Sequence, residues 1–143
     1  MTAEAFAVDT SVAVPLLLRA HPEHAAVAAW ADGKQLSLAG HAAVETYSVL
    51  TRLPAGARAS SDDVVRAMDD SFAEVLVLSA SVARMAHRQF SRYGIAGGAA
   101  HDALVGLAAK ENGLTLATRD TRALGTYQAV GVPILVLATN ADC

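Results

Sequence analysis

Four carboxylates in this chain of 143 residues stand where they could hold a metal ion together: Asp9, Glu45, Asp102 and Asp120. Asp9 ends the first strand-like run of the chain, and Asp120 follows a later one, residues 114–118. The strands of a parallel sheet end at a common edge, and ligands bind beyond that edge. We therefore expect both of these acids at the same edge.

The other two acids fall in helical segments. Asp102 opens a helix directly after a loop of small residues, 96–100, and the start of a helix favours a negative charge. Glu45 lies in a helical segment that is otherwise apolar. Each acid taken singly also has a structural interpretation. Asp9 and Asp102 could cap helices, Asp120 could start a turn and Glu45 could be a solvated helix residue.

The four acids taken together indicate a metal site. Clustered carboxylates repel one another and raise one another's pKa unless a cation neutralises them. The only cysteine is Cys143, so a cysteine-based metal site and an intramolecular disulfide are both excluded. Ligands that are all oxygen suit Mg²⁺ or Mn²⁺ rather than Zn²⁺.

Strand-like runs alternate with helical patterns along the whole chain. The expected strands are residues 6–9, 35–39, 74–78, 114–118 and 132–137. The expected helices are an apolar one after Asp9, with Pro15 tolerated near its first turn, and residues 23–32, 41–53, 60–72, 79–93, 101–112 and 121–130. Continuous apolar strands joined by helices are typical of buried parallel sheets. The sequence therefore predicts an α/β fold, a three-layer α/β/α sandwich with a mainly parallel central sheet.

The composition fits one globular domain, residues 1–143, without repeats or linkers. Hydrophobic residues make up 53% of the chain, which excludes a disordered protein. The longest apolar runs, 12–18 and 132–138, fall far short of the roughly 20 residues that a membrane-spanning helix needs. The first residues show no secretory signal, so we expect a cytoplasmic protein without a membrane partner. The large residues expected in the helical core are Met68, Met85, Tyr47 and Phe72.

Four short motifs occur in the order and approximate spacing of PIN domains. They are Val8-Asp-Thr-Ser11, Glu45, His101-Asp-Ala-Leu104 and Thr118-Arg-Asp120. The resemblance spans residues 6–137, and the length and single-domain form are similar to the VapC toxins of bacterial type II toxin–antitoxin (VapBC) pairs. One departure is His101, which stands where relatives often carry an aromatic residue; we interpret it as a packing or groove residue.

The resemblance implies an endoribonuclease that hydrolyses RNA phosphodiesters and leaves 5′-phosphate and 3′-hydroxyl ends. One or two Mg²⁺ (or Mn²⁺) ions would activate water and offset charge on the phosphate. Asp9 and Asp102 are then the principal metal ligands. Asp120 and Glu45 would hold a second ion or orient the attacking water, which makes all four acids catalytic.

Supporting and substrate-binding residues follow from the same resemblance. Ser11 and Thr118 would assist through hydroxyl hydrogen bonds. The formal net charge of −3 becomes +1 when the four acids are set aside, and arginines outnumber lysines nine to two. Arg52 and Arg58 flank a turn and could reach the substrate backbone. Three more arginines recur every four residues and form one helical stripe, which either faces RNA or is a solvated surface: Arg84, Arg88 and Arg92.

By the same resemblance the partners are an RNA substrate, a second copy of the chain in a homodimer, and a cognate VapB-like antitoxin whose tail covers the acidic site.

His21 and His24 are interpreted as solvated residues at a helix start.

Three alternatives compete with this interpretation. A receiver domain needs a lysine after its last strand, and the only lysines, Lys34 and Lys110, are not in that place. A haloacid-dehalogenase-type phosphatase needs a second aspartate two residues after the first, where this chain has Ser11. The sequence therefore disfavours both of these folds. The third alternative stays open: a catalytically silent PIN-like module that binds RNA or protein without cutting.

Overall fold

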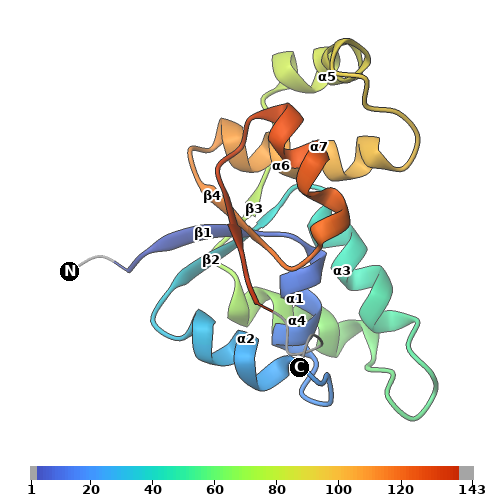
Figure 1. Ribbon diagram of the computed structural model, residues 1–143. Helices are drawn as coiled ribbons and strands as arrows, with labels where there is room; N and C mark the ends of the chain where they lie inside the picture. The colour runs from blue at the N-terminus through green and yellow to red at the C-terminus, as the bar shows by residue number, and fades with distance from the viewer. Residues whose placement is uncertain (1–2, 139–143) are drawn as a thin grey trace.

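A computed structural model describes residues 3–138, so the terminal Cys143 lies outside the described residues. Five parallel strands form one central sheet in the order β3-β2-β1-β4-β5 (Figure 1). The strands are β1 (Ala5–Val8), β2 (Gln35–Ala39), β3 (Val75–Leu76), β4 (Thr115–Thr118) and β5 (Ile134–Val136). The helices are α1 (Thr10–Leu17), α2 (His24–Ala31), α3 (Ala42–Thr51), α4 (Ser61–Ser71), α5 (Ala80–Arg92), α6 (Ala99–Glu111), the 3₁₀ turn η1 (Thr121–Ala123) and α7 (Leu124–Val130).

Helices cover both faces of the sheet, which confirms the predicted three-layer α/β/α fold. Successive strand residues point to opposite faces. Ala7 and Leu116 therefore join a core with α6 and α7, whereas Val8 joins a second core with α1, α2 and α4. In Figure 1 these two helix groups lie on opposite sides of the strands. Within residues 3–138, no helix has the length and apolar character needed to cross a membrane.

The sheet register brings two strand ends together. Val8 of β1 is aligned with Leu38 of β2 on one side and with Ala117 of β4 on the other. Asp9 and Thr118 come immediately after these aligned residues. The central strands thus deliver both side chains to one point on the carboxyl edge of the sheet.

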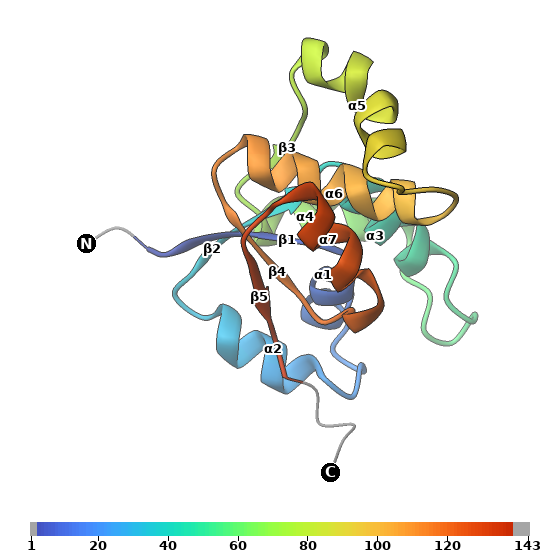
Figure 2. The same cartoon turned by 45° about the horizontal axis from the view of Figure 1, so that its top comes forward.

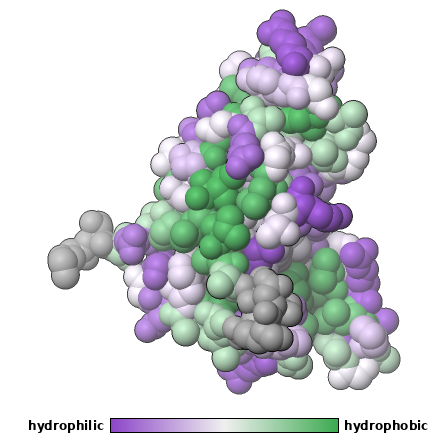
Figure 3. Space-filling view, in the orientation of Figure 1, coloured by the Kyte–Doolittle hydropathy of each residue, from purple (hydrophilic) through white to green (hydrophobic). Residues whose placement is uncertain are grey.

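The two outer strands are shorter than the sequence predicted. The strand expected at 74–78 pairs only over Val75–Leu76, because β3 has a neighbour on one side alone. Val75 and Val136, on the two edges of the sheet, are 47% and 46% exposed. Figure 3 shows apolar surface in the middle of the face where β5 lies. Weak pairing at an edge shortens a strand without changing the order of the sheet.

The α5 helix projects from the body of the protein, as both ribbon views show (Figure 2). Ser79 caps it as predicted, and it packs through Ala86 and Phe90. The core assignment of Met85 is consequently wrong, since its side chain lies off this narrow contact and is 47% exposed. Tyr47 is also outside the core, at 37% exposed. Of the four residues expected inside, Phe72 is buried and Met68 is partly buried.

Pro15 lies in the second turn of α1, not near the first as predicted. Proline has no N–H, so it leaves the carbonyl of the residue four positions earlier without its helical partner. That residue is Ser11, and its carbonyl accepts a hydrogen bond from the Arg119 guanidinium at 3.4 Å. A residue beside the acidic edge of the sheet thereby compensates the break in α1.

Candidate active site

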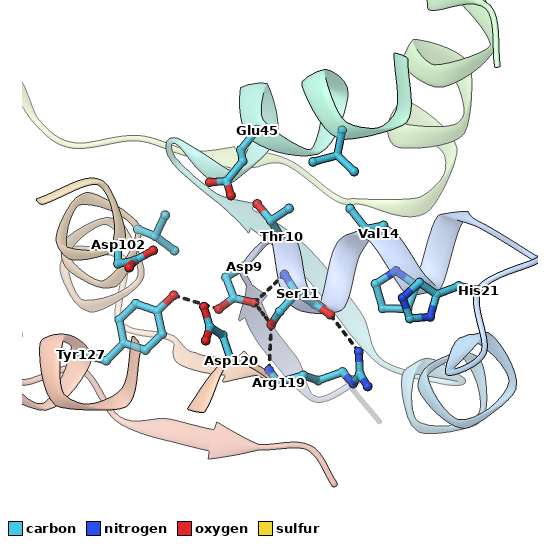
Figure 4. Close-up of a pocket in the computed structure, with 13 residues that line it drawn as sticks. Asp9, Thr10, Ser11, Val14, His21, Glu45, Asp102, Arg119, Asp120 and Tyr127 are labelled. Atoms are coloured by element: carbon cyan, nitrogen blue, oxygen red, sulfur yellow. Dashed lines mark hydrogen bonds between the residues drawn. The ribbon is translucent and has the colours of Figure 1, made fainter. Parts of the chain in front are cut away.

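Asp9 is held at the start of α1 by four donors. Its carboxylate caps the helix through the Ser11 N–H at 3.1 Å and accepts the Ser11 hydroxyl at 2.5 Å. On the other oxygen it accepts the hydroxyls of Thr118 at 2.5 Å and Tyr127 at 2.8 Å. A carboxylate offers about four lone-pair positions. Asp9 is only 4% exposed, so this buried side chain is fixed in one orientation (Figure 4).

Burial raises the pKa of Asp9 above its usual value, and the nearby charge of Asp120 adds to the rise. The hydrogen bonds from Ser11, Thr118 and Tyr127 act in the opposite direction and hold the carboxylate form. Burial and the neighbouring Asp9 also raise the pKa of Tyr127, which keeps this phenol protonated as a donor. The predicted helpers Ser11 and Thr118 therefore both donate a hydroxyl hydrogen bond to Asp9.

The remaining three acids face the same pocket from three different elements. Glu45 lies in the first turn of α3, Asp102 in the first turn of α6, and Asp120 caps η1. All three line the same pocket as Asp9 (Figure 4). The topology has thus assembled the four acids that are separated by up to 111 positions in the sequence.

These acids repel one another. The pKa of Asp102 is raised, first by burial and then by the negative charges of Asp120 and Glu45. In the described part of the chain no three acidic, histidine or cysteine side chains stand close enough to hold an ion as they are oriented. The donor set nevertheless fits a divalent cation, because it consists of oxygen ligands whose mutual repulsion a cation would relieve.

Two residues that sequence reasoning missed contact this cluster. Tyr127, from α7, donates to Asp9 across 118 positions of sequence. Arg122 donates to the Asp120 carboxylate at 3.2 Å while its own side chain stays 86% exposed. A lone tyrosine in a mostly apolar helix was one available signal, because a buried phenol needs a hydrogen-bond partner.

Arg119 lies on the wall of the pocket away from Asp102 (Figure 4). Its backbone N–H donates to the Ser11 hydroxyl at 2.7 Å, and its guanidinium pairs with Glu23 at 3.6 Å. His21 also lines this wall and is partly buried, with its Nδ1 accepting the Glu23 N–H at 3.0 Å. The interpretation of His21 as a solvated residue is wrong. His24 likewise contacts the chain, with its Nδ1 2.8 Å from the Pro15 carbonyl oxygen.

The arginines expected to bind substrate lie away from this pocket. The stripe of Arg84, Arg88 and Arg92 runs along exposed positions of α5, and Arg52 follows the last residue of α3. None of the four lines the acidic pocket. A contact with a long RNA outside the pocket is still a prediction.

Comparison with known proteins gives a consistent picture. Residues 6–128 match the PIN domain model. The chain is 50% identical to Ribonuclease VapC27 of Mycobacterium tuberculosis over 132 residues, covering 92% of this chain and 96% of the relative. It is 41% identical to Ribonuclease VapC40 of the same species over 127 residues, covering 88% and 94%. Among solved structures, FitAcB from Neisseria gonorrhoeae has a similar fold, with a TM-score of 0.60 at 21% identity, covering 90% of this chain and 95% of the neighbour.

Proposed function

The chain belongs to the PIN-domain family, and on that premise we propose that it is a divalent-metal-dependent endoribonuclease, the toxin of a toxin–antitoxin pair. The observation that carries the proposal is the convergence of Asp9, Glu45, Asp102 and Asp120 on one pocket at the carboxyl edge of the sheet. The match to VapC ribonucleases over nine-tenths of the chain supports the choice of RNA as the substrate.

Asp9 and Asp102 are the principal ligands of the cation, with Asp120 and Glu45 as its further ligands or as the group that orients the attacking water. Mg²⁺ or Mn²⁺, when bound, lowers the pKa of water and offsets charge on phosphate oxygens. The protein's own part is positional. Ser11, Thr118 and Tyr127 hold the Asp9 carboxylate in place and oppose the rise of its pKa on burial, so one ligand is oriented before any ion arrives.

We further propose that a VapB-like antitoxin covers the pocket and that the toxin forms a homodimer in the cytoplasm. The negative charge gathered in the pocket suits a basic segment of such an antitoxin. Co-expression with the product of a neighbouring gene, followed by purification of a stoichiometric complex, tests the first point. Sedimentation of the free toxin tests the second.

Cleavage of total cellular RNA tests the activity. Antitoxin-free wild type is compared with Asp9→Ala and Asp102→Ala, with Mg²⁺ or Mn²⁺ and with EDTA. Asp70→Ala, which removes an exposed acid of α4 outside the pocket, is the matched control. Discrete fragments that require the metal, persist in the control and vanish in both site variants are expected. Cleavage that survives both site variants would contradict the assignment, and absence of cleavage by folded wild type would favour a binding module.

A further inference from the structure

A second cavity adjoins the acidic pocket and shares two of its walls. Glu45 and Asp102 line both spaces, and the second one extends outward past the following residues: His41, His101, Arg122 and Thr126. Its volume of about 550 Å³ falls within the range of about 300–1,000 Å³ that is typical of small-molecule sites. Anything that reaches the acids from this side passes these side chains.

Two histidine rings stack at the mouth of this cavity. His41 precedes α3 and His101 lies in the first turn of α6, and their ring centroids are 5.0 Å apart with an angle of 20° between the planes. Both residues are exposed. Neither ring makes a hydrogen bond with any part of residues 3–138. Packing within the fold therefore does not account for the pair, and both side chains are accessible to solvent.

A positively charged side chain, that of Arg122, also lines this cavity. The Arg122 guanidinium is 86% exposed and pairs with Asp120, which belongs to the acidic cluster. An RNA phosphate approaching four carboxylates meets repulsion, and a nearby guanidinium offsets it while offering a planar fork of donors. Stacked aromatic rings beside a cation are the combination that binds single-stranded nucleotides.

We propose that this second cavity seats the nucleotide next to the phosphodiester that is cut. Its base extends the stack formed by His41 and His101, and its phosphate pairs with Arg122. The inference deepens the proposed ribonuclease function and rests on it, since the shared walls Glu45 and Asp102 place the seat beside the acids. The two histidines and Arg122 are thus positioning residues for the substrate, distinct from the four acids.

The first test needs no cleavage. NMR signals of the His41 and His101 ring protons are followed while each nucleoside 5′-monophosphate is added at fixed pH in EDTA. Stacking on a base should move both signals upfield in a saturable way, with His87, exposed on α5, as the internal control. Arg122→Ala should lower the affinity for the monophosphate, so that saturation requires a higher concentration. Arg66→Ala, which removes an exposed arginine paired with Asp63, should leave the affinity unchanged. Unmoved signals of His41 and His101 would overturn the proposal.

The second test uses a pool of RNA with random sequence. Loss of both rings in the His41→Ala/His101→Ala variant should raise KM about tenfold, leave kcat nearly unchanged and weaken the base preference at one position beside the cut. His101→Phe, which keeps a flat ring, should have a KM near that of wild type, and His87→Ala should behave as wild type. An unchanged KM and base preference in an active double variant would refute the seat while leaving the nuclease intact. If wild type cuts no RNA, the proposed function fails. The monophosphate titration then decides by itself whether the cavity binds a nucleotide.

Discussion

Asp9 and Asp102 line the same pocket, but the fold treats them in opposite ways. Asp9 is 4% exposed and accepts four hydrogen bonds, two of them from residues more than 100 positions away. Asp102 is half-buried on the first turn of α6 and accepts no hydrogen bond within the described residues. Instead it lies in the repulsive field of Asp120 and Glu45.

The difference shows that the site combines carboxylates held in place by hydrogen bonds with carboxylates whose orientation can change. Asp9 is fixed by the folded core, and Asp120 is held by the backbone N–H and the guanidinium of Arg122. The Glu45 and Asp102 side chains accept no hydrogen bond within residues 3–138, so their orientation can adjust to a cation. Preorganised ligands lose less freedom on binding, whereas unpaired neighbours of like charge are destabilising until the charge is neutralised. One part of the pocket therefore provides a carboxylate that hydrogen bonds hold in place. The other part provides carboxylates whose mutual repulsion a bound cation would relieve.

Replacing each acid should separate these two roles most strongly. Asp9→Ala and Asp102→Asn should both lower RNA cleavage by about a thousandfold or more, the scale of several kcal/mol that metal catalysis supplies. Only Asp9→Ala should also lower the free energy of unfolding, by about 2–4 kcal/mol, because it leaves the buried hydroxyls of Thr118 and Tyr127 unpaired. Urea denaturation in EDTA measures the difference. Equal stability losses in the two variants would remove the distinction between a fixed and a free acid.

Removing one donor from Asp9 should have a smaller effect. Tyr127→Phe keeps the ring packed against Gly106 and deletes only the hydroxyl. We expect metal affinity to fall by about 10–100-fold, as for other residues that orient a ligand, and stability to fall by about 1 kcal/mol. Calorimetric titration with Mn²⁺ gives the affinity. Tyr93→Phe, at a tyrosine that is 50% exposed on the surface, is the matched control, and an equal response of the two variants would rule out the positioning role.

The pH dependence of stability should reveal the cost of burying these acids and of placing them close together. The pKa values of Asp9 and Asp102 are both raised in the folded protein, so between the ordinary pKa of about 3.9 and the raised values the folded state binds more protons than the unfolded state. Without metal, stability should fall as pH rises through that window. Asp102→Asn should recover a few tenths of a kcal/mol above the window, since Asp102 is only partly buried. Unfolding measured in EDTA from pH 4 to 8 tests this, and a variant as pH-sensitive as wild type would argue against it.

The raised pKa values of Asp9 and Asp102 should also set the lowest pH at which the pocket binds a metal ion. Both carboxylates must be ionised to bind a cation, so affinity should be lost on acidification at a higher pH than for an ordinary aspartate site. A limit at the ordinary aspartate pKa would contradict the burial and repulsion described for this pocket.

The smallest effect is expected from the α5 stripe. Replacing Arg84, Arg88 and Arg92 together with alanine should reduce the salt dependence of RNA binding by about one unit of slope for each phosphate that is no longer bound, without changing metal affinity. Arg66→Ala serves as the control on another helix. Identical salt slopes in both proteins would show that α5 presents a solvated surface and that the pocket alone grips the substrate.

Much of this architecture was accessible from the sequence because its signals are local. Continuous apolar strands at 35–39 and 114–118 predicted a parallel sheet, and Asp9 and Asp120 were placed at its carboxyl edge. Tyr127 was missed because no local pattern shows that α7 folds back over the end of β1. His101 was expected to pack or to line a groove, but its partner His41 emerged only from the meeting of α3 and α6.

Binding of Mn²⁺ to metal-free protein tests the central claim most directly. Wild type, Asp102→Asn and the control Asp70→Asn are titrated by calorimetry at neutral pH, and their thermal unfolding is followed with and without the ion. Saturable binding of one or two ions that raises the unfolding temperature of wild type and the control, but is lost in Asp102→Asn, is the predicted result. Equal binding by all three proteins would contradict the claim that these carboxylates form the cation site.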